Sequence, residues 1–366
     1  MNIILTGVTG TLGSKVLHEL LEQKADSLET IYVLVRKKQR LTPQKRIDNM
    51  LASDATPDFI KNNLSAFQHK IQVIDAIYML DPAFFLKKNQ DNYFIHSAGY
   101  VNLSLDPNHK KEIFEENFEL TKSIFKKYSE YIRKFIYIST AFSIGEVTGQ
   151  IDNDYLSSGS GKYRNNYEAS KHASEHFLRE EANKKGIALQ ILRPSVLGGN
   201  IFDTKFFISK YMVFYLFAKF FYATKSNDTI RIQAGEKVGL NIIPVDYAAK
   251  VIVKVFESDI EQLNIVHSKT TPMVSGIKKI LDTVGFTNFS ITEDMISEAV
   301  TFESKLEKFY YQTIGIHLSP YFNSQPHEWD TTLLEKILPI PAYDLEDYLV
   351  GAIEYATTND FKNQRW

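Results

Sequence analysis

Short apolar runs alternate with amphipathic stretches through the first half of the chain. The apolar runs predict strands, and apolar residues at helical spacing predict a helix over Leu12–Glu22. This alternation predicts an α/β fold built on a doubly wound parallel sheet, and the nearly all-apolar strands predict helices on both of its faces. The other elements are expected as strands at Asn2–Leu5, Thr30–Val35, Gln72–Ile74, Tyr93–His96, Lys134–Ser139 and Ala188–Leu192, and as helices near Ile113–Tyr131 and Tyr167–Lys185.

The pattern changes after Pro194. Residues 200–232 are rich in aromatic residues and are expected to be helical, and the chain is mostly helical again from about Val274. A short strand at Asn241–Val245 and a helix at Asp246–Phe256 lie between these parts. We therefore expect a nucleotide-binding domain of residues 1–200 plus 233–270, and a smaller, mainly helical substrate-binding lobe of residues 200–232 plus 271–366.

Composition narrows the function. The 366 residues are 44% hydrophobic and 23% charged, as in packed globular proteins, and a net charge of -2 provides no basic field for nucleic acid. The chain has no cysteine, which excludes disulfides, thiolate metal sites and a cysteine nucleophile and fits a reducing cytoplasm. Lysines interrupt the most apolar stretch, residues 206–222, so no transmembrane helix is expected, and no metal site is predicted.

A glycine-rich turn joins the first strand to the first helix. Gly7 can turn tightly off the strand, Gly10 lets the backbone approach a pyrophosphate, and Gly13 lets the helix pack on the sheet. The first helix then presents free N–H groups to the anion. With Thr9 and Leu12 of the same turn, these residues predict a dinucleotide site of the Rossmann type.

The end of the second strand distinguishes the two nicotinamide dinucleotides. An NAD site usually has an acid there, to bind the ribose diol, whereas this chain has Arg36. A planar guanidinium suits a 2′-phosphate, and Arg46 follows nearby. We expect NADP(H) as the cofactor, and the alternative is an ordinary solvated basic loop.

Further cofactor contacts are expected at the ends of the third and fourth strands. Asp75 can accept a hydrogen bond from the adenine amino group, or it can cap a helix. Asn117 can hold a water or the backbone near the site, or make a plain buried hydrogen bond. His96 is given no chemistry. Small residues that let a cofactor lie close follow His96: Ser97, Ala98 and Gly99.

Tyr167 and Lys171 are four residues apart, so on a helix they lie one turn from each other on one face. The ammonium of Lys171 is expected to lower the pKa of Tyr167, which then exchanges a proton with a substrate oxygen. Two hydroxyls, on Ser139 and Thr140, end the fifth strand, where one can donate to the same oxygen as negative charge develops on it.

These motifs occur in the order found in extended short-chain dehydrogenases, which the chain resembles over about residues 1–250. It looks most similar to the thioester reductases, which include fatty acyl-CoA reductases of the male sterility type and terminal reductase domains of carboxylic acid reductases and peptide synthetases. The resemblance implies NADPH as donor and Thr140 in place of the usual catalytic serine. It also implies a thioester of CoA or a carrier protein, and cofactor contacts at Lys171, Pro194, Ser195 and Val196.

The chain departs from the family in two ways. It carries no adenylation or carrier domain, so the acyl group is expected to arrive in trans, and its last hundred residues match no known pattern. The alternatives are an extended short-chain dehydrogenase acting on a ketone, a hydroxysteroid-like compound or a nucleotide sugar, and a non-enzymatic NADP sensor. The aromatic residues of 206–222 could line an acyl channel, pack in a core or dimer interface, or rest on a membrane surface.

Overall fold

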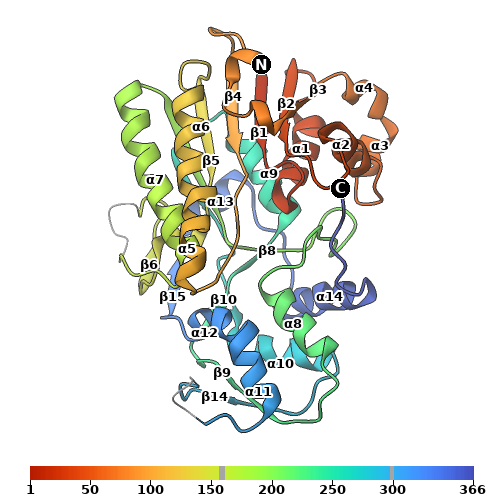
Figure 1. Cartoon of the computed structure of the whole chain (residues 1–366), viewed down its shortest axis with the longest axis vertical. Helices are drawn as coiled ribbons and strands as arrows, with labels where there is room; N and C mark the ends of the chain where they lie inside the picture. The colour runs from red at the N-terminus through yellow and green to blue at the C-terminus, as the bar shows by residue number, and fades with distance from the viewer. Residues whose placement is uncertain (156–160, 297–300) are drawn as a thin grey trace.

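A seven-stranded parallel sheet dominates the computed structural model, which describes residues 1–155, 161–296 and 301–366. The strand order is β12-β7-β5-β4-β1-β2-β3. Helices cover both faces of the sheet, and a second group of helices lies below it (Figure 1). The sheet strands are β1 Asn2–Thr6, β2 Thr30–Val35, β3 Ile71–Asp75, β4 Asn92–His96, β5 Lys134–Ile138, β7 Ala188–Pro194 and β12 Gln262–Ile265.

Alternation along β1 explains why the sheet is covered on both sides. Ile3 and Leu5 belong to a hydrophobic cluster on one face, whereas Ile4 belongs to the cluster on the other face. The doubly wound sheet predicted from the sequence is confirmed, with strand ends that differ by one or two residues from those expected. The helices around the sheet are α1 Thr11–Gln23, α2 Pro43–Leu51, α3 Asp58–Asn62, α4 Leu64–Gln68, α5 Pro107–Phe114, α6 Leu120–Tyr128, α7 Asn166–Lys185, α9 Val245–Val255 and α13 Thr332–Ile337.

The strand order reverses between β1 and β4, and this position is where ligands bind in open α/β sheets. β1 pairs with β2 on one side and β4 on the other, so the loops that follow β1 and β4 lie side by side. The expected helix near Ile113–Tyr131 is divided by a π-helical turn at Glu115–Glu119. Such turns occur frequently at functional sites.

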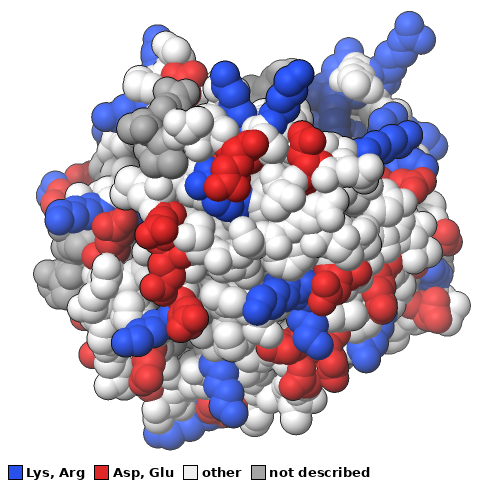
Figure 2. Space-filling view, turned by 90° about the horizontal axis from the view of Figure 1, so that it is seen from below, with Lys and Arg blue, Asp and Glu red and all other residues white. Residues whose placement is uncertain are grey.

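A second hydrophobic cluster, mostly aromatic and aliphatic, lies below the sheet and combines residues 208–242 with residues 273–361. Seen from below, this part carries both acidic and basic side chains around a broad uncharged area (Figure 2). Its helices are α8 Phe214–Ala223, α10 Met273–Thr283, α11 Lys305–Tyr310, α12 Ile316–Phe322 and α14 Leu345–Thr358; the short strands outside the main sheet are β6 Gly149–Ile151, β8 Val196–Gly198, β9 Ile230–Gln233, β10 Gly239–Leu240, β11 Ile242–Pro244, β13 Thr271–Pro272, β14 Phe289–Thr292 and β15 His327–Trp329.

One expectation for this part was wrong. Residues 200–232 are not helical throughout, because only α8 is a helix and β9 follows it as a strand. Phe206 and Val213 have positive φ angles of 65° and 51°, which no α-helix accommodates. The chain after Val274 is mostly helical, as expected, and its short strands pair with earlier ones, β14 with β9 and β15 with β6.

After α14 the chain returns to the sheet. Residues 359–366 run from this helix to the end of the sheet near α1 and α2 (Figure 1). None of the helices in the described ranges combines the length and the apolar character needed to cross a membrane.

Candidate active site

The glycine turn fits a bound pyrophosphate. Gly7 has a φ of 73°, and a Cβ added there would lie 2.7 Å from the backbone nitrogen of Ala98. A Cβ on Gly13 would lie 2.2 Å from the carbonyl oxygen of Gly7, so both positions need glycine. Gly10 precedes α1 without any side-chain cap, and no acid lies in the first turn. The free N–H groups at Thr11 and Leu12 can therefore face an anion.

A cationic corner adjoins this turn at the end of β2. Arg46 donates from Nη2 to Thr9 Oγ1 at 2.8 Å and from Nη1 to the carbonyl oxygen of Arg36 at 2.6 Å. The Arg36 side chain is exposed and lies 3.4 Å from Glu116. Lys210, from the segment before α8, also lies in this corner. Burial lowers the pKa of its ammonium, and the positive charges of Lys38 and the two arginines lower it further. The corner has the charge that a 2′-phosphate requires.

The other expected contacts at the strand ends have defined positions. Asp75 accepts a hydrogen bond from the backbone nitrogen of Ile77 at 3.1 Å and thereby caps a short 3-10 turn. His96 bridges Thr6 Oγ1 at 2.7 Å and Thr121 Oγ1 at 3.0 Å. Burial lowers the pKa of His96 to about 3, so this histidine is neutral and structural.

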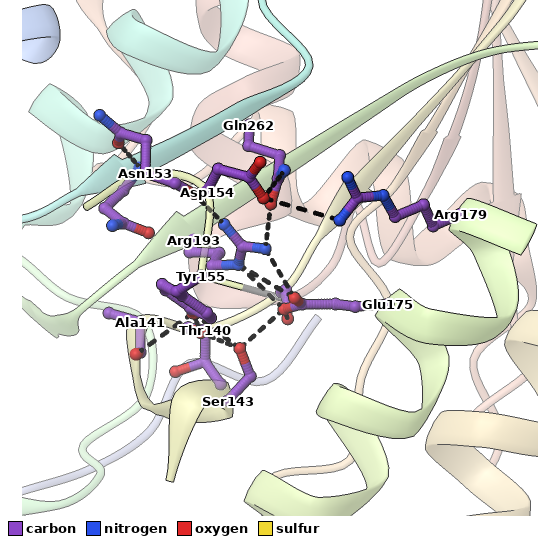
Figure 3. Close-up of polar contacts among 12 residues, drawn as sticks. Thr140, Ala141, Ser143, Asn153, Asp154, Tyr155, Glu175, Arg179, Arg193 and Gln262 are labelled. Atoms are coloured by element: carbon purple, nitrogen blue, oxygen red, sulfur yellow. Dashed lines mark hydrogen bonds and ion pairs between the residues drawn. The ribbon is translucent and has the colours of Figure 1, made fainter. Parts of the chain in front are cut away.

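The turn after β5 separates the roles of Ser139 and Thr140. Ser139 Oγ donates to the carboxylate of Glu175 on α7, and Ser143 Oγ donates to the same carboxylate at 2.7 Å. Arg193 of β7 completes this buried network behind Thr140 (Figure 3). Ser139 is therefore occupied by a structural contact. The hydroxyl of Thr140 has one long contact, 3.4 Å from the backbone nitrogen of Phe142.

The negative charge of Glu175 is balanced by the positive charge of Arg193 within this network. Burial alone would raise the pKa of Glu175, but Arg193 and the two serine hydroxyls hold it below its usual range. Tyr155 adds its ring, 3.9 Å from the guanidinium carbon of Arg193, and its hydroxyl, 2.8 Å from Ser143 Oγ. The network thus joins α7, β7 and the turn after β5 into one rigid unit.

Tyr167 and Lys171 both lie on α7, as expected, but their electrostatics differ from the prediction. Lys171 Nζ donates to the carbonyl oxygen of Ile138 at 2.7 Å, and burial lowers its pKa to about 7. Burial, and next Glu168, raise the pKa of Tyr167 above its ordinary value. The expectation that Lys171 lowers the pKa of Tyr167 below its ordinary value is therefore wrong. The phenol is protonated at neutral pH, which is the form that can give a proton to a substrate.

Asn117 connects the loop after β4 to α7, the helix that carries Tyr167 and Lys171. Its Oδ1 accepts from the backbone nitrogen of Tyr100 at 2.8 Å, and its Nδ2 donates to the Tyr100 carbonyl and to Ser170 Oγ. The amide thus holds the backbone of this loop at Tyr100, as the first alternative for this residue expected, and its bond to Ser170 is buried. A Cβ on Gly99 would lie 3.9 Å from Lys171 Nζ, so the loop begins beside the catalytic amine.

One polar group at the end of β7 has no protein partner. Ser195 Oγ is buried and makes no hydrogen bond with any part of the chain that the structure describes. Its neighbours Pro194 and Val196 end β7 and begin β8. A buried hydroxyl of this kind suits a ligand that brings its own hydrogen-bonding groups. The chain thus fits a nicotinamide dinucleotide at both ends of the site.

An apolar groove begins at the loop that follows β4. It has a volume of about 210 Å³ and runs between the loop after β4, the start of α8 and α12. The β-branched Val213 in its wall has a φ of 51°, a strained conformation that tends to occur at functional sites. The lining is Tyr100, Val101, Asn102, Leu103, Ser104, Met212, Val213, Leu216, Ile314, His317 and Leu318.

The aromatic residues of 206–222 mostly have another role. They pack into the core below the sheet, which agrees with the core alternative, and only Tyr222 among them is a largely exposed aromatic residue. A membrane-facing helix is therefore not what this segment forms. The groove is lined instead by Met212, Val213 and Leu216, which the sequence interpretation had not selected.

Other residues of the site were also missed. Glu175 and Arg193 are charged residues without exposure, and Lys210 was noted only as an interruption of an apolar run. Buried charges 18 residues apart give no local signal in a sequence. Arg193 directly precedes Pro194 and Ser195, for which the resemblance implies cofactor contacts, and this position is the signal that could have drawn attention to it.

Comparison with known proteins places this site in a family. The model of the family described as "Male sterility protein" matches residues 5–252. The chain belongs to this male sterility protein family. The resemblance inferred from the sequence is confirmed, and the matched segment contains the glycine turn, Thr140, Tyr167 and Lys171.

Relatives of this male sterility family member are distant. Fatty acyl-CoA reductase 1 of Mus musculus is 26% identical over 232 residues, which are 54% of this chain and 44% of the relative. The chain thus aligns with less than half the length of that relative.

Solved structures share the fold. The terminal R domain from the myxalamid PKS-NRPS biosynthetic pathway has a TM-score of 0.70 at 19% identity and covers 100% of this chain and 92% of its own. UDP-glucuronic acid 4-epimerase from Bacillus cereus has a TM-score of 0.65 at 16% identity and covers 98% and 100%.

Proposed function

We propose that this chain is an NADPH-dependent reductase that converts an acyl thioester to an aldehyde or alcohol. The observation that carries the proposal is the apolar groove that starts beside the catalytic helix. Its lining begins at Tyr100, directly after Gly99, where an added Cβ would lie 3.9 Å from Lys171 Nζ, and its walls are largely hydrocarbon side chains. Such a groove suits an acyl chain and provides no charged partner for the diphosphate of a nucleotide sugar.

The chemistry follows from the side chains. NADPH, when bound, supplies a hydride to the thioester carbonyl carbon. As negative charge develops on the carbonyl oxygen, Thr140 donates a hydrogen bond and Tyr167 gives its proton, so the carbon–oxygen double bond becomes a C–OH bond. The resulting hemithioacetal breaks its carbon–sulfur bond, and the thiol leaves with the hydroxyl proton as the aldehyde forms. A second hydride transfer would give the alcohol.

NADPH is preferred because Arg36, Arg46 and Lys210 surround the ribose end while the acid typical of an NAD site is missing. Glu116 beside Arg36 is the one acidic contact in this corner within the described ranges. A chain without cysteine suits a reducing compartment, and we place the enzyme in the cytoplasm.

The thioester arrives on CoA or on a carrier protein. The mouse relative is named a fatty acyl-CoA reductase, and the myxalamid structure is a terminal domain of a PKS-NRPS pathway. The first name supports a CoA thioester as substrate, and the second supports an acyl group bound to a carrier protein.

A screen of NADPH oxidation tests the proposal. Acyl-CoAs, acyl-carrier thioesters, ketones and nucleotide sugars are each offered to the purified full chain, and free thiol is measured in parallel. We expect loss of NADPH with stoichiometric thiol release for long-chain acyl thioesters alone. Turnover of a ketone or nucleotide sugar, with no reaction of thioesters, would contradict it.

A further inference from the structure

The segment of residues 359–366, here called the strap, connects the lower part of the molecule to the phosphate-binding turn. It follows α14 and runs beside the segment before α8 (Figure 1). Tyr211 donates from its backbone nitrogen to Asn363 Oδ1 at 2.8 Å, and Gln364 donates from its backbone nitrogen to the Ser209 carbonyl at 2.9 Å. The strap is therefore fixed along its length before it reaches the cofactor end of the sheet.

Trp366 makes the contact with the turn itself. Its indole Nε1 donates to the Thr9 carbonyl at 3.1 Å, and its own carbonyl oxygen accepts from Arg46 Nε at 3.0 Å. The side chain is 5% exposed and belongs to the hydrophobic cluster that also includes Val8 and Ile47. Trp366 thus contacts both the phosphate-binding turn and the arginine beside it.

These contacts fix the orientation of Arg46. Nε is held by Trp366, Nη1 by the Arg36 carbonyl and Nη2 by Thr9 Oγ1. A guanidinium has five N–H groups, so one on each terminal nitrogen has no partner within the described part of the chain. A guanidinium can use N–H groups on both terminal nitrogens to bind a phosphate.

We propose that Trp366 is a positioning residue for cofactor choice. Its buried indole, bonded to the Thr9 carbonyl, fixes the main-chain oxygen of Trp366 against Nε of Arg46, and this leaves other N–H groups of the guanidinium available for the 2′-phosphate that distinguishes NADPH from NADH. The strap is thereby part of the specificity of a site whose Arg46 lies 320 residues earlier. This inference rests on the proposed function, because it takes NADP(H) as the ligand.

Binding of the two cofactors to the full chain, measured by calorimetry, tests this role. We expect Trp366→Ala to raise the Kd for NADPH about tenfold and the Kd for NADH less than about twofold. Both variants keep the backbone carbonyl and lose the bond to the Thr9 carbonyl, but Trp366→Phe retains most of the ring packing that anchors the residue, so a smaller shift in the same direction is expected. Lys362→Ala is the matched control, because Lys362 is an exposed strap residue paired only with Asp360.

A double-mutant cycle separates positioning from general damage. If Trp366 acts through Arg46, then Trp366→Ala adds no further loss of NADPH affinity to an Arg46→Ala variant. Equal weakening of both cofactors, or additive losses in the cycle, would overturn the inference and leave Trp366 as an ordinary core residue. The same cycle with Trp366→Phe gives this answer if Trp366→Ala fails to fold.

The outcomes also separate this inference from the proposed function. A wild-type preference for NADPH that survives Trp366→Ala overturns the role of Trp366 alone. A wild-type protein that binds NADH as tightly as NADPH overturns the proposed cofactor and, with it, this inference.

Discussion

Arg193 donates hydrogen bonds to both carboxylate oxygens of Glu175, at 3.2 Å to Oε1 and 2.8 Å to Oε2, and neither side chain is exposed. The same carboxylate accepts from Ser139, next to the proposed catalytic Thr140. This ion pair therefore connects the helix that carries Tyr167 and Lys171 to the turn that carries Thr140.

Removing one charge of this pair should destabilise the fold. Glu175→Gln leaves the buried Arg193 without a counter-charge, and we expect a loss of about 3–5 kcal/mol in the free energy of unfolding. Urea unfolding of the ligand-free protein measures it. Glu181→Gln is the control, since Glu181 lies on the same helix with an exposed partner, Lys184, and should leave stability unchanged. Equal stability of the two variants would contradict a structural role for the pair.

Substitutions of Thr140 and Ser139 should have different effects, the first on activity and the second on stability. Thr140→Val removes a hydroxyl aimed at the reacting oxygen, so we expect kcat to fall about 10²–10³-fold with little change in NADPH affinity. Ser139→Ala removes a buried hydrogen bond to Glu175 instead, which costs about 1–3 kcal/mol of stability and affects kcat much less. Steady-state kinetics and urea unfolding of both variants check this, and the reverse pattern would assign the catalytic hydroxyl to Ser139.

Lys171 should make stability depend on pH. Burial lowers the pKa of Lys171 from 10.5 to about 7. Between these values the unfolded chain binds a proton at this amine and the folded chain does not, so the free energy of unfolding from this group rises with pH. Lys171→Met should abolish that part of the rise between about pH 7 and about pH 10. Lys184→Met on the same helix, whose amine is exposed, should keep the wild-type slope.

The groove should determine which chain lengths react. Leu216 lines it, so Leu216→Trp fills space that a long acyl chain would occupy. We expect KM for a long-chain thioester to rise about tenfold, while KM for a short-chain thioester stays nearly constant. Lys219→Ala on the same helix, at an exposed position, serves as the control. A uniform effect on all chain lengths would place the acyl chain elsewhere.

The sheet and the glycine turn could be predicted because their signals are local. The run from Asn2 to Gly13 contains its strand, its turn and its helix start within twelve residues, and Tyr167 and Lys171 share one helical turn. Residues 200–232 could not be predicted in the same way. There the apolar residues serve a core that is completed by residues 273–361, and positive φ angles at Phe206 and Val213 follow from that packing rather than from local preference.

The electrostatics of the site depend on contacts that the sequence does not place. The four-residue spacing correctly put Lys171 one turn from Tyr167, but the desolvation that raises the pKa of Tyr167 depends on the surrounding core. Trp366 and Thr9 are 357 residues apart, and no periodicity or motif connects them. Sequence patterns thus identified the side chains proposed to take part in the reaction. Tertiary packing determines their pKa values and the contacts that hold them in place.

The most direct test of the reductase account is a comparison of wild-type protein with Tyr167→Phe, following NADPH absorbance and free thiol together on a long-chain acyl-CoA. The account predicts that wild type consumes NADPH and releases thiol, that Tyr167→Phe loses at least about 10²-fold in kcat, and that both bind NADPH with similar Kd. Turnover by Tyr167→Phe at the wild-type rate would contradict it.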